Sequence, residues 1–459
     1  MIKGGAVLDF IHGLDLDDLP REVVAQAQRC IRDLIATAAG GATTPLSRIV
    51  RDHCARQFLC PGEGSRMLFD GRRVGRVGAA LAGGMTIDAY DAHDGHRLAK
   101  GHAGVAVLPA ALAYADDAEL ALEAEEVLAA VIVGYEVALR AGVALHRTAA
   151  DYHTSGAWTA LGVAGLAARL LGLDIERTRH ALGTAEYHGP RSQMMRCIDH
   201  PTMVKDGSGW GAMAGVSAAE LAAAGFTGAP ALLCEGDDVT DLWADLGTRW
   251  YLMEMNFKPY PVCRWAQPAI EAARALQHAH AIAAADLVEI EVATFHEATR
   301  LAIRRPATTE EAQYSLPFPL AAVLVRDELG AEEISAEAFA DPEILRLSDA
   351  VTMVEDEGCN ARFPTERLAR VTLRLHDGRT FASDFTAARG DPEAPLSEGE
   401  LSVKFYDLMD PLVGRSRAVD VERDITALTE DPRSLLRLLD AVLGPAEASG
   451  AVPASVAGY

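Results

Sequence analysis

Residues 86–113 read TIDAYDAHDGHRLAKGHAGVAVLPAALA and join two segments whose apolar residues have helical spacing, 74–90 and 104–117. The second segment is apolar almost all round, as in a helix buried among other helices. Residues 88–102, in contrast, contain three histidines, three aspartates, one arginine and one lysine. Packing alone rarely requires such a cluster, and histidine titrates near neutral pH. We therefore expect a loop or broken helix here, with the segment Asp91 to His102 in an active site.

Similar helical patterns fill most of the first 280 residues, and they are rich in alanine, which loses no side-chain entropy in a helix. Several are apolar almost all round, which favours helices packed on helices. The predicted helices outside the opening stretch are 20–40, 123–147, 155–171, 174–187, 208–224 and 262–280.

The pattern changes after about residue 280. DLVEIEVATFHEA (286–298) alternates like a strand, and so does LARVTLRLHDGRTFASDF (368–385), with Asp377-Gly378 as a hairpin turn. The helical pattern returns from residue 397, and a chain of 459 residues is long enough for two hydrophobic cores. We predict a mainly α fold, with a large all-helical domain built from both chain ends (1–270 and 397–459) and a smaller inserted α+β domain (271–396).

The composition excludes several classes of partner and location. Lys+Arg 42 against Asp+Glu 66 gives a net charge of −24, which repels nucleic acid and anionic membranes. Seven cysteines without a CxxC pair argue against a disulfide framework and a zinc ribbon. The first residues lack the apolar core of a signal peptide, and the apolar runs are short or interrupted by charges. We expect a cytoplasmic protein whose anionic substrate needs a local basic pocket.

The residues alone leave two interpretations of the 88–102 cluster open. His93, Asp94, His96 and His102 are good metal ligands and could serve a metal-dependent hydrolase. The same histidines and carboxylates could instead form an acid/base and anion-binding site without a metal.

Three further segments carry candidate residues. In DYHTSG (151–156), Thr154 or Ser155 could cap the next helix, whose N-terminus favours anions. In HPTMVKDGSGWGAMAG (200–215), Lys205 precedes a helix whose glycines allow close packing; no strand precedes them, so a dinucleotide site is rejected. In NFKPYPVCR (256–264), two prolines fix a turn, and Lys258, Tyr260 and Arg264 are expected to face one pocket. Cys263 lacks the neighbouring histidine of a catalytic thiol.

Together and in this order, these segments resemble the MmgE/PrpD family, which comprises 2-methylcitrate dehydratases, cis-aconitate decarboxylase and iminodisuccinate epimerase. The resemblance runs nearly end to end and includes LPREVVAQAQRCIRDLIATAAGG (19–41), GYEVALR (134–140), EAQYSLPFPLA (311–321) and ARGDPEAPLSEGELSVKF (388–405). It implies a homodimer, a lid formed by the α+β domain, a site in the cleft below that lid, and no metal, flavin or iron–sulfur cofactor.

The resemblance also assigns site residues by position. Five are predicted to be catalytic, namely Asp91, His102, His153, Lys205 and Lys258. Their neighbours are predicted to bind the substrate, namely Asp94, His96, Arg97, Tyr152, Tyr260, Cys263 and Arg264. We expect His102 and His153 to be the acid/base pair, with Asp91 orienting one of them and the lysines holding substrate carboxylates.

The family's reactions imply a cofactor-independent enzyme that acts at a carbon next to a carboxylate of a small di- or tricarboxylate. A hydro-lyase similar to 2-methylcitrate dehydratase is expected first, and an epimerase of an amino-dicarboxylate or a decarboxylase of a cis-aconitate-like acid are the alternatives. Three departures from the family pattern add weight to the epimerase. Asp94-Gly95-His96 stands where decarboxylase and dehydratase members tend to have Asp-Asp-Thr, Cys263 replaces a histidine of the decarboxylase, and Gln267 stands where histidine is frequent. A non-catalytic binding protein on the same fold also stays open.

Overall fold

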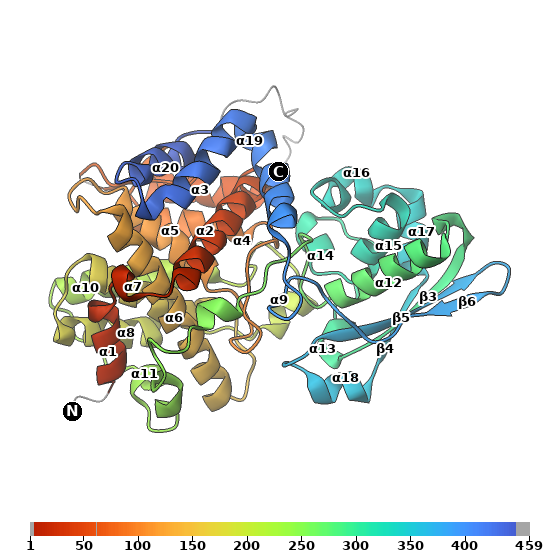
Figure 1. Ribbon diagram of the computed structural model, residues 1–459, viewed down its shortest axis with the longest axis horizontal. Coiled ribbons are helices and arrows are strands. Elements are labelled where there is room, and N and C mark those ends of the chain that lie inside the picture. The colour runs from red at the N-terminus through yellow and green to blue at the C-terminus, as the bar shows by residue number, and fades with distance from the viewer. Residues whose placement is uncertain (1–3, 61, 447–459) are drawn as a thin grey trace.

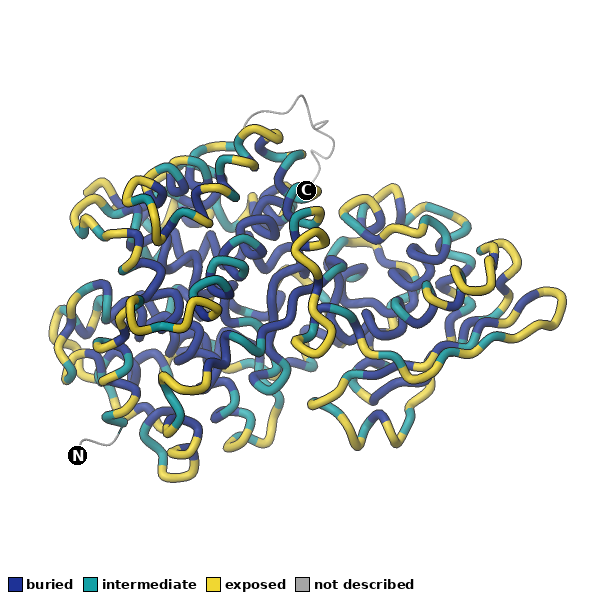
Figure 2. The backbone as a smooth tube through the Cα atoms, viewed as in Figure 1, coloured by how far each residue is buried: buried dark blue, intermediate teal, exposed yellow. Residues whose placement is uncertain are grey.

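The computed structural model describes residues 4–60 and 62–446, which form a larger helical body and a smaller α+β body side by side (Figure 1). Buried backbone is concentrated inside each body, and exposed residues lie mainly on the outer loops and helix faces (Figure 2). The predicted fold class, a mainly α protein with a small mixed sheet, is confirmed. The exact boundaries after 270 and 396 stay predictions, and the last part of the segment 397–459 lies outside the described residues.

The helical body contains every helix predicted before residue 225, each within three residues of its expected ends. Its long helices from the first part of the chain are α1 (Gly5–Gly13), α2 (Arg21–Ala42), α3 (Pro45–Gln57), α4 (Arg76–Asp88), α5 (Gly104–Ala115), α6 (Ala124–Thr148), α7 (Gly156–Leu170), α8 (Ile175–His188) and α10 (Ser208–Ala223). Shorter elements are α9 (Met195–Asp199), α11 (Leu232–Glu235), and the antiparallel pair β1 (Ser65–Arg66) and β2 (Arg73–Val74).

The end of the chain returns to this body, as the sequence predicts. Helix α19 (Glu398–Thr426) packs on α2, and α20 (Ser434–Leu443) packs on α19. Helix α19 begins with a capping box in which Ser397 and Glu400 satisfy each other's backbone N–H groups. Arg29 and Arg32 of α2 pair with Glu398 of α19, so ion pairs at the surface join the two chain ends.

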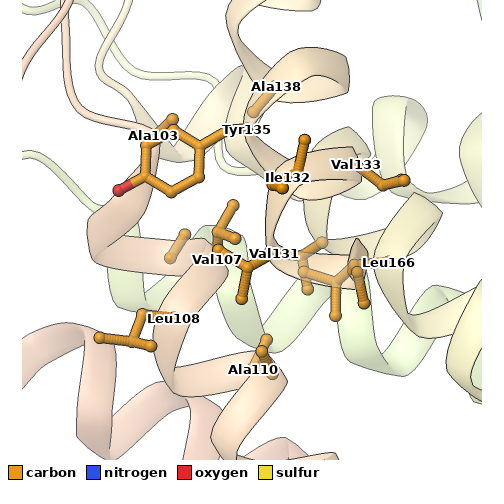
Figure 3. Packing of buried hydrophobic residues seen from close by; sticks show 14 of the residues in the cluster. Ala103, Val107, Leu108, Ala110, Val131, Ile132, Val133, Tyr135, Ala138 and Leu166 are labelled. Carbon is orange, nitrogen blue, oxygen red and sulfur yellow. The ribbon is translucent and has the colours of Figure 1, made fainter. Parts of the chain in front are cut away.

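The interior of this body is built from small and branched side chains that let helices approach closely. Val107 and Leu108 of α5 pack near Val131 of α6 and Leu166 of α7 (Figure 3). Helix α10 lies so close to α7 that a Cβ added to Gly211 would stand 2.6 Å from a backbone oxygen of α7. The prediction that the glycines of 200–215 serve close helix packing is therefore confirmed.

Helix α6 is long and apolar enough to cross a membrane by length and composition, and it is the one helix of the described residues that meets this test. In its most apolar window, however, 94% of the residues are buried inside the protein. This burial is typical of a central core helix. The apolar length of α6 is therefore explained by packing inside the protein.

The α+β body has a mixed sheet in the order β4-β3-β5-β6, with β7 also paired to β5. Its strands are β3 (Leu287–Thr294), β4 (Val351–Glu355), β5 (Leu368–Leu375), β6 (Thr380–Ala382) and β7 (Thr386–Ala387). Strands β5 and β6 form the predicted hairpin, and Gly378 in its turn has φ +86°. Strands β3 and β4 are parallel, and most of the body's helices belong to the crossover between them.

The helices of this body are α12 (Gln267–His280), α13 (His296–Thr299), α14 (Thr309–Gln313), α15 (Pro317–Arg326), α16 (Ala336–Phe339), α17 (Pro342–Asp349) and α18 (Glu357–Arg362). Helix α12 begins five residues later than predicted because the chain before it forms a turn, in which the N–H of Cys263 donates to the carbonyl of Gln313. The core of this body also contains Tyr90 and Ala92. The segment 88–102, which begins beside these two residues, therefore lies at the junction of the two bodies.

Candidate active site

A small cavity of about 40 Å³ lies at this junction, and both bodies contribute to its walls. The predicted loop 88–102 is observed between α4 and α5 and forms one wall. The titratable lining residues are Asp91, His96, Lys100, His102, Tyr152, Asp206, Lys258, Cys263, Arg264, Tyr314 and Arg367. A cavity of this size holds a few water molecules.

Asp91 and Lys258 form a buried ion pair at the centre of this site. The Lys258 Nζ donates to Asp91 Oδ1 at 2.6 Å and to the Asp91 carbonyl oxygen at 3.2 Å. Burial opposes ionisation of Asp91, but the charges of Lys258 and Lys205 outweigh it and lower the pKa of this carboxyl. Asp91 is therefore an ionised carboxylate that fixes the Lys258 ammonium.

Gln313, the last residue of α14, joins Lys205 to Asp91. Its Oε1 accepts from Lys205 Nζ at 2.6 Å and from the backbone N–H of Asp91 at 3.0 Å. Its Nε2 donates to the Ala89 carbonyl at 3.2 Å and to Thr309 Oγ1 at 2.9 Å. One amide of the α+β body thus positions two predicted catalytic residues of the helical body.

His102 is held by the backbone of the same loop. Its Nδ1 lies 2.5 Å from the carbonyl oxygen of Asp94, and a carbonyl only accepts, so the proton is assigned to Nδ1 and the lone pair to Nε2. Burial, followed by the charges of His93 and Lys258, lowers the pKa of His102 well below its usual value. His102 is therefore a neutral imidazole with a free basic nitrogen, as a general base requires.

The tight loop around His102 explains why a glycine stands at position 95. A Cβ added to Gly95 would stand 3.1 Å from two atoms of the His102 ring and 3.3 Å from Asn256 Oδ1. Gly95 also pairs with Asn256 through an isolated antiparallel bridge. A side chain at position 95 would push the imidazole out of its present place.

Asp206 also lines the cavity, and its pKa is shifted in the direction opposite to that of His102. The N–H of Ser155 donates to Asp206 Oδ1 at 3.1 Å, and the Ser155 hydroxyl donates to Oδ2 while accepting from the backbone N–H of His102 at 2.9 Å. Burial and then the charge of Asp88 raise the pKa of Asp206 to about 8. The predicted capping role of Ser155 is wrong, because this hydroxyl bridges Asp206 and the His102 backbone and makes no cap.

Comparison with known proteins agrees with this architecture. The family model described as the MmgE/PrpD N-terminal domain matches residues 6–244, and the one described as the MmgE/PrpD C-terminal domain matches residues 260–429. The chain belongs to the MmgE/PrpD family. A cis-aconitate decarboxylase of Aspergillus terreus is 25% identical over 484 residues, which cover 95% of this chain and 96% of that protein. A cis-aconitate decarboxylase-like protein oryM of Aspergillus oryzae is 22% identical with the same coverage.

These matches confirm the predicted family, and with it the coarse expectation of a lyase-type enzyme of carboxylic acid metabolism. Both family models together span nearly the whole described chain. The identities are low, so the individual reaction of this MmgE/PrpD member is treated below as a proposal.

His153 does not line the cavity, although the sequence predicts a catalytic role for it. Its Nδ1 contacts the carbonyl of Asp151 at 2.8 Å, its backbone N–H donates to His146 Nε2 at 3.2 Å, and it pairs with Gln193 in an isolated bridge. It is absent from the residues that line the cavity, so the structure does not bring His102 and His153 together as an acid/base pair.

Four predicted substrate-binding side chains point elsewhere. The Asp94 carboxylate accepts from the Tyr135 hydroxyl at 2.6 Å, inside the helical body, and burial raises its pKa to about 7. The His96 ring stacks on Tyr251, although His96 also lines the cavity. Arg97 pairs with Glu393 at the surface, and Tyr260 lines a separate cavity. Local spacing could not reveal these directions, because they depend on packing against distant helices.

Three further predicted substrate-binding residues, Tyr152, Cys263 and Arg264, also line the cavity. Arg264 pairs with Asp391 at 3.0 Å and donates to the Arg389 carbonyl, so its guanidinium is largely occupied. Burial raises the pKa of Cys263 to about 12, which keeps it a thiol and agrees with its rejection as a nucleophile. The Tyr152 hydroxyl donates to the Lys100 carbonyl at 2.8 Å and fixes the loop.

The four metal ligands considered from the sequence, His93, Asp94, His96 and His102, do not come together at one point. Among the residues that the structure describes, the group of ligand atoms within 4.8 Å of one another comes from Asp91, His93 and His102. Asp94 and His96 are outside it, and the ammonium of Lys258 already occupies a position beside Asp91. A divalent cation would have to compete with that ammonium.

Substitution of Gln313 by leucine is expected to lower kcat/KM roughly 10- to 100-fold, because a buried ammonium and a buried N–H would lose their acceptor. The measurement is steady-state kinetics on the turned-over carboxylic acid together with thermal unfolding. Gln277→Leu is the control, since Gln277 also donates to a carbonyl within the α+β body, that of Leu324, whereas Gln313 accepts from Lys205 and Asp91. Equal kinetics for both variants would remove Gln313 from the site.

Proposed function

We propose that this protein is a cofactor-independent acid/base enzyme that removes a proton from the carbon next to a carboxylate of a small di- or tricarboxylate, and that it acts as a hydro-lyase. The observation that carries the proposal is the fixed tautomer of His102. Its Nδ1 is committed to the Asp94 carbonyl, which leaves Nε2 free to accept the proton.

The protonation states support elimination of water. The lowered pKa of His102 keeps the imidazole neutral at pH 7, whereas burial and the charge of Asp88 raise the pKa of Asp206 and favour its protonated form. Opposite pKa shifts of two neighbouring groups are the usual sign of a base and an acid. Nε2 of His102 takes the proton from carbon, the C–O bond breaks as the C=C bond forms, and the Asp206 carboxyl protonates the leaving hydroxyl to give water.

The charge that develops on the substrate also has a partner. Removal of the α-proton places negative charge on the adjacent carboxylate, and a fixed cation lowers this barrier most when it needs no reorganisation. The Lys258 ammonium is fixed by Asp91, and both line the cavity with His102. Lys205 is held by Gln313 and lies outside the cavity lining, from where it adds positive charge to the site.

Decarboxylation is the second candidate, favoured by the names of the matched relatives, which are cis-aconitate decarboxylases. Epimerisation of an amino-dicarboxylate is the third, and it also uses one base and one acid. The products separate the three reactions, because only elimination forms an alkene and water, only decarboxylation releases CO2, and only epimerisation returns the starting skeleton with inverted configuration.

The purified protein is expected to exchange or remove α-protons of at least one acid among citrate, 2-methylcitrate, malate and iminodisuccinate. The acids are incubated with it in deuterium oxide and followed by proton NMR, with and without EDTA. Loss of the α-proton signal together with a new vinyl signal is the expected result, unchanged by EDTA. Absence of exchange with every acid would overturn the proposal, and activity that EDTA abolishes would support the metal-dependent alternative.

A further inference from the structure

The cavity lining contains four side chains that can carry positive charge, namely Lys100, Lys258, Arg264 and Arg367. Two of them have carboxylate partners within the protein, since Lys258 pairs with Asp91 and Arg264 pairs with Asp391. In the described part of the chain, Lys100 and Arg367 have no such partner within ion-pair distance. Two cationic side chains of the described site, Lys100 and Arg367, therefore lack a carboxylate partner within the protein.

Arg367 belongs to the α+β body and directly precedes β5. Its Nε is buried without a hydrogen-bond partner, although the residue as a whole is only partly buried. Burying a guanidinium nitrogen without an acceptor costs free energy, and a ligand that supplies the acceptor would recover it. The charge of Arg367 also acts on Tyr152 and Cys263, which line the same cavity.

Lys100 belongs to the loop of the helical body and is partly buried. Its Nζ lies 5.2 Å from the centre of the Tyr152 ring, and the Tyr152 hydroxyl donates to its carbonyl oxygen. Its backbone has φ +55°, an unfavourable conformation for lysine that the loop imposes. Tyr152 thus links the two unpaired cations, because it contacts Lys100 and lies within the field of Arg367.

We propose that Lys100 and Arg367 form a subsite for a second carboxylate of the substrate, remote from the carboxylate activated beside His102 and Lys258. This inference rests on the proposed function and adds a specificity element to it. A guanidinium matches a carboxylate in a two-pronged geometry, and an ammonium adds a point charge. The two cations come from different bodies, so the bound carboxylate also joins these bodies.

Because each cation would otherwise stay without an anion, the subsite selects di- and tricarboxylates over monocarboxylates. A monocarboxylate placed with its reacting carbon at His102 would leave both cations unpaired in a narrow cavity. Discrimination by unsatisfied polar groups is stronger than discrimination by size.

The subsite is tested by titration calorimetry with tricarballylate, which carries three carboxylates and no hydroxyl, and with butanoate, which carries one carboxylate. Arg367→Met is expected to weaken tricarballylate binding roughly 10- to 100-fold, as for loss of charge-assisted hydrogen bonds, and Lys100→Met to weaken it less. Butanoate binding is expected to be weak and equal in all proteins. Arg367→Lys keeps the charge but loses the two-pronged guanidinium. Its affinity for tricarballylate is expected to lie between those of Arg367→Met and the wild type.

Arg362→Met is the matched control, since Arg362 belongs to the same body and pairs with Glu366 at the surface. Thermal unfolding checks that each variant is folded, and Arg367→Lys carries the test if Arg367→Met does not fold. Wild-type affinity of the Arg367 variants for tricarballylate would overturn the subsite while the proposed function stands. A wild-type protein that neither binds tricarballylate nor exchanges α-protons of any acid would overturn the proposed function itself.

Discussion

His102→Gln is expected to lower the rate of α-proton exchange by roughly 10²- to 10⁴-fold, the usual contribution of a general base. Glutamine approximates the size of the ring, but it offers no basic nitrogen in place of the imidazole that now contacts the Asp94 carbonyl at 2.5 Å. Proton exchange measured by NMR in deuterium oxide reports this step directly. Thermal unfolding close to that of the wild type would show that the loop is intact.

His153→Gln is the informative comparison, because the sequence predicts a catalytic role for His153 and the structure keeps it outside the cavity lining. We expect this variant to retain most of the exchange rate. A large loss in His153→Gln together with a small one in His102→Gln would reverse the assignment of the base.

The pH profile adds a second readout for the same residue. A base acts when it is deprotonated, so kcat/KM falls as the pH falls through the pKa of the base in the free enzyme. Burial and the charges of His93 and Lys258 lower the pKa of His102. The acid limb of the profile should therefore lie clearly below pH 6.5 and disappear in His102→Gln.

Lys258→Met is expected to lower activity about 10²- to 10³-fold and to destabilise the protein by about 3–5 kcal/mol. The first effect follows from loss of the fixed cation beside the reacting carboxylate. The second follows because Asp91 would remain buried without its 2.6 Å partner, and an unpaired buried charge is costly. Steady-state kinetics and chemical denaturation measure the two effects separately.

The double variant Lys258→Met, Asp91→Asn separates chemistry from folding. Removing both charges should restore much of the stability, whereas activity should stay low because the cation is still missing. Arg66→Met is the control for a broken pair elsewhere, since Arg66 contacts Asp116 at 2.6 Å outside the cavity. Recovery of activity in the double variant would show that Lys258 serves only the stability of Asp91.

The sequence predicted the helices well because their apolar residues recur with helical spacing and their ends carry clear stop signals. Helix α2, for example, begins at Arg21 after Pro20 and ends at Ala42, one residue after Gly40-Gly41. The sequence predicted the pairing of the strands less well. Strands β3 and β4 are neighbours although 56 residues lie between Thr294, the last of β3, and Val351, the first of β4, and no local pattern encodes such a parallel pair.

The candidate site was predicted in part. Asp91, His102, Lys205 and Lys258 meet at the junction of the two bodies, as the order of the motifs suggested. Asp206 was overlooked although it adjoins Lys205, because its role depends on burial beside Asp88. Gln313 and Arg367 come from segments more than two hundred residues away from the loop, and only the packing of the two bodies shows that they reach it.

The contact between His102 and the carbonyl of residue 94 has a consequence for evolution and for engineering. Every amino acid carries the same carbonyl, so the placement of the base is inherited through the course of the main chain and not through the identity of a neighbouring side chain. The carbonyl stays available to His102 after a substitution at residue 94 as long as the loop keeps its path. Mutational scans at this position will report on the fit against Tyr135, whereas insertions or deletions in the loop will report on catalysis.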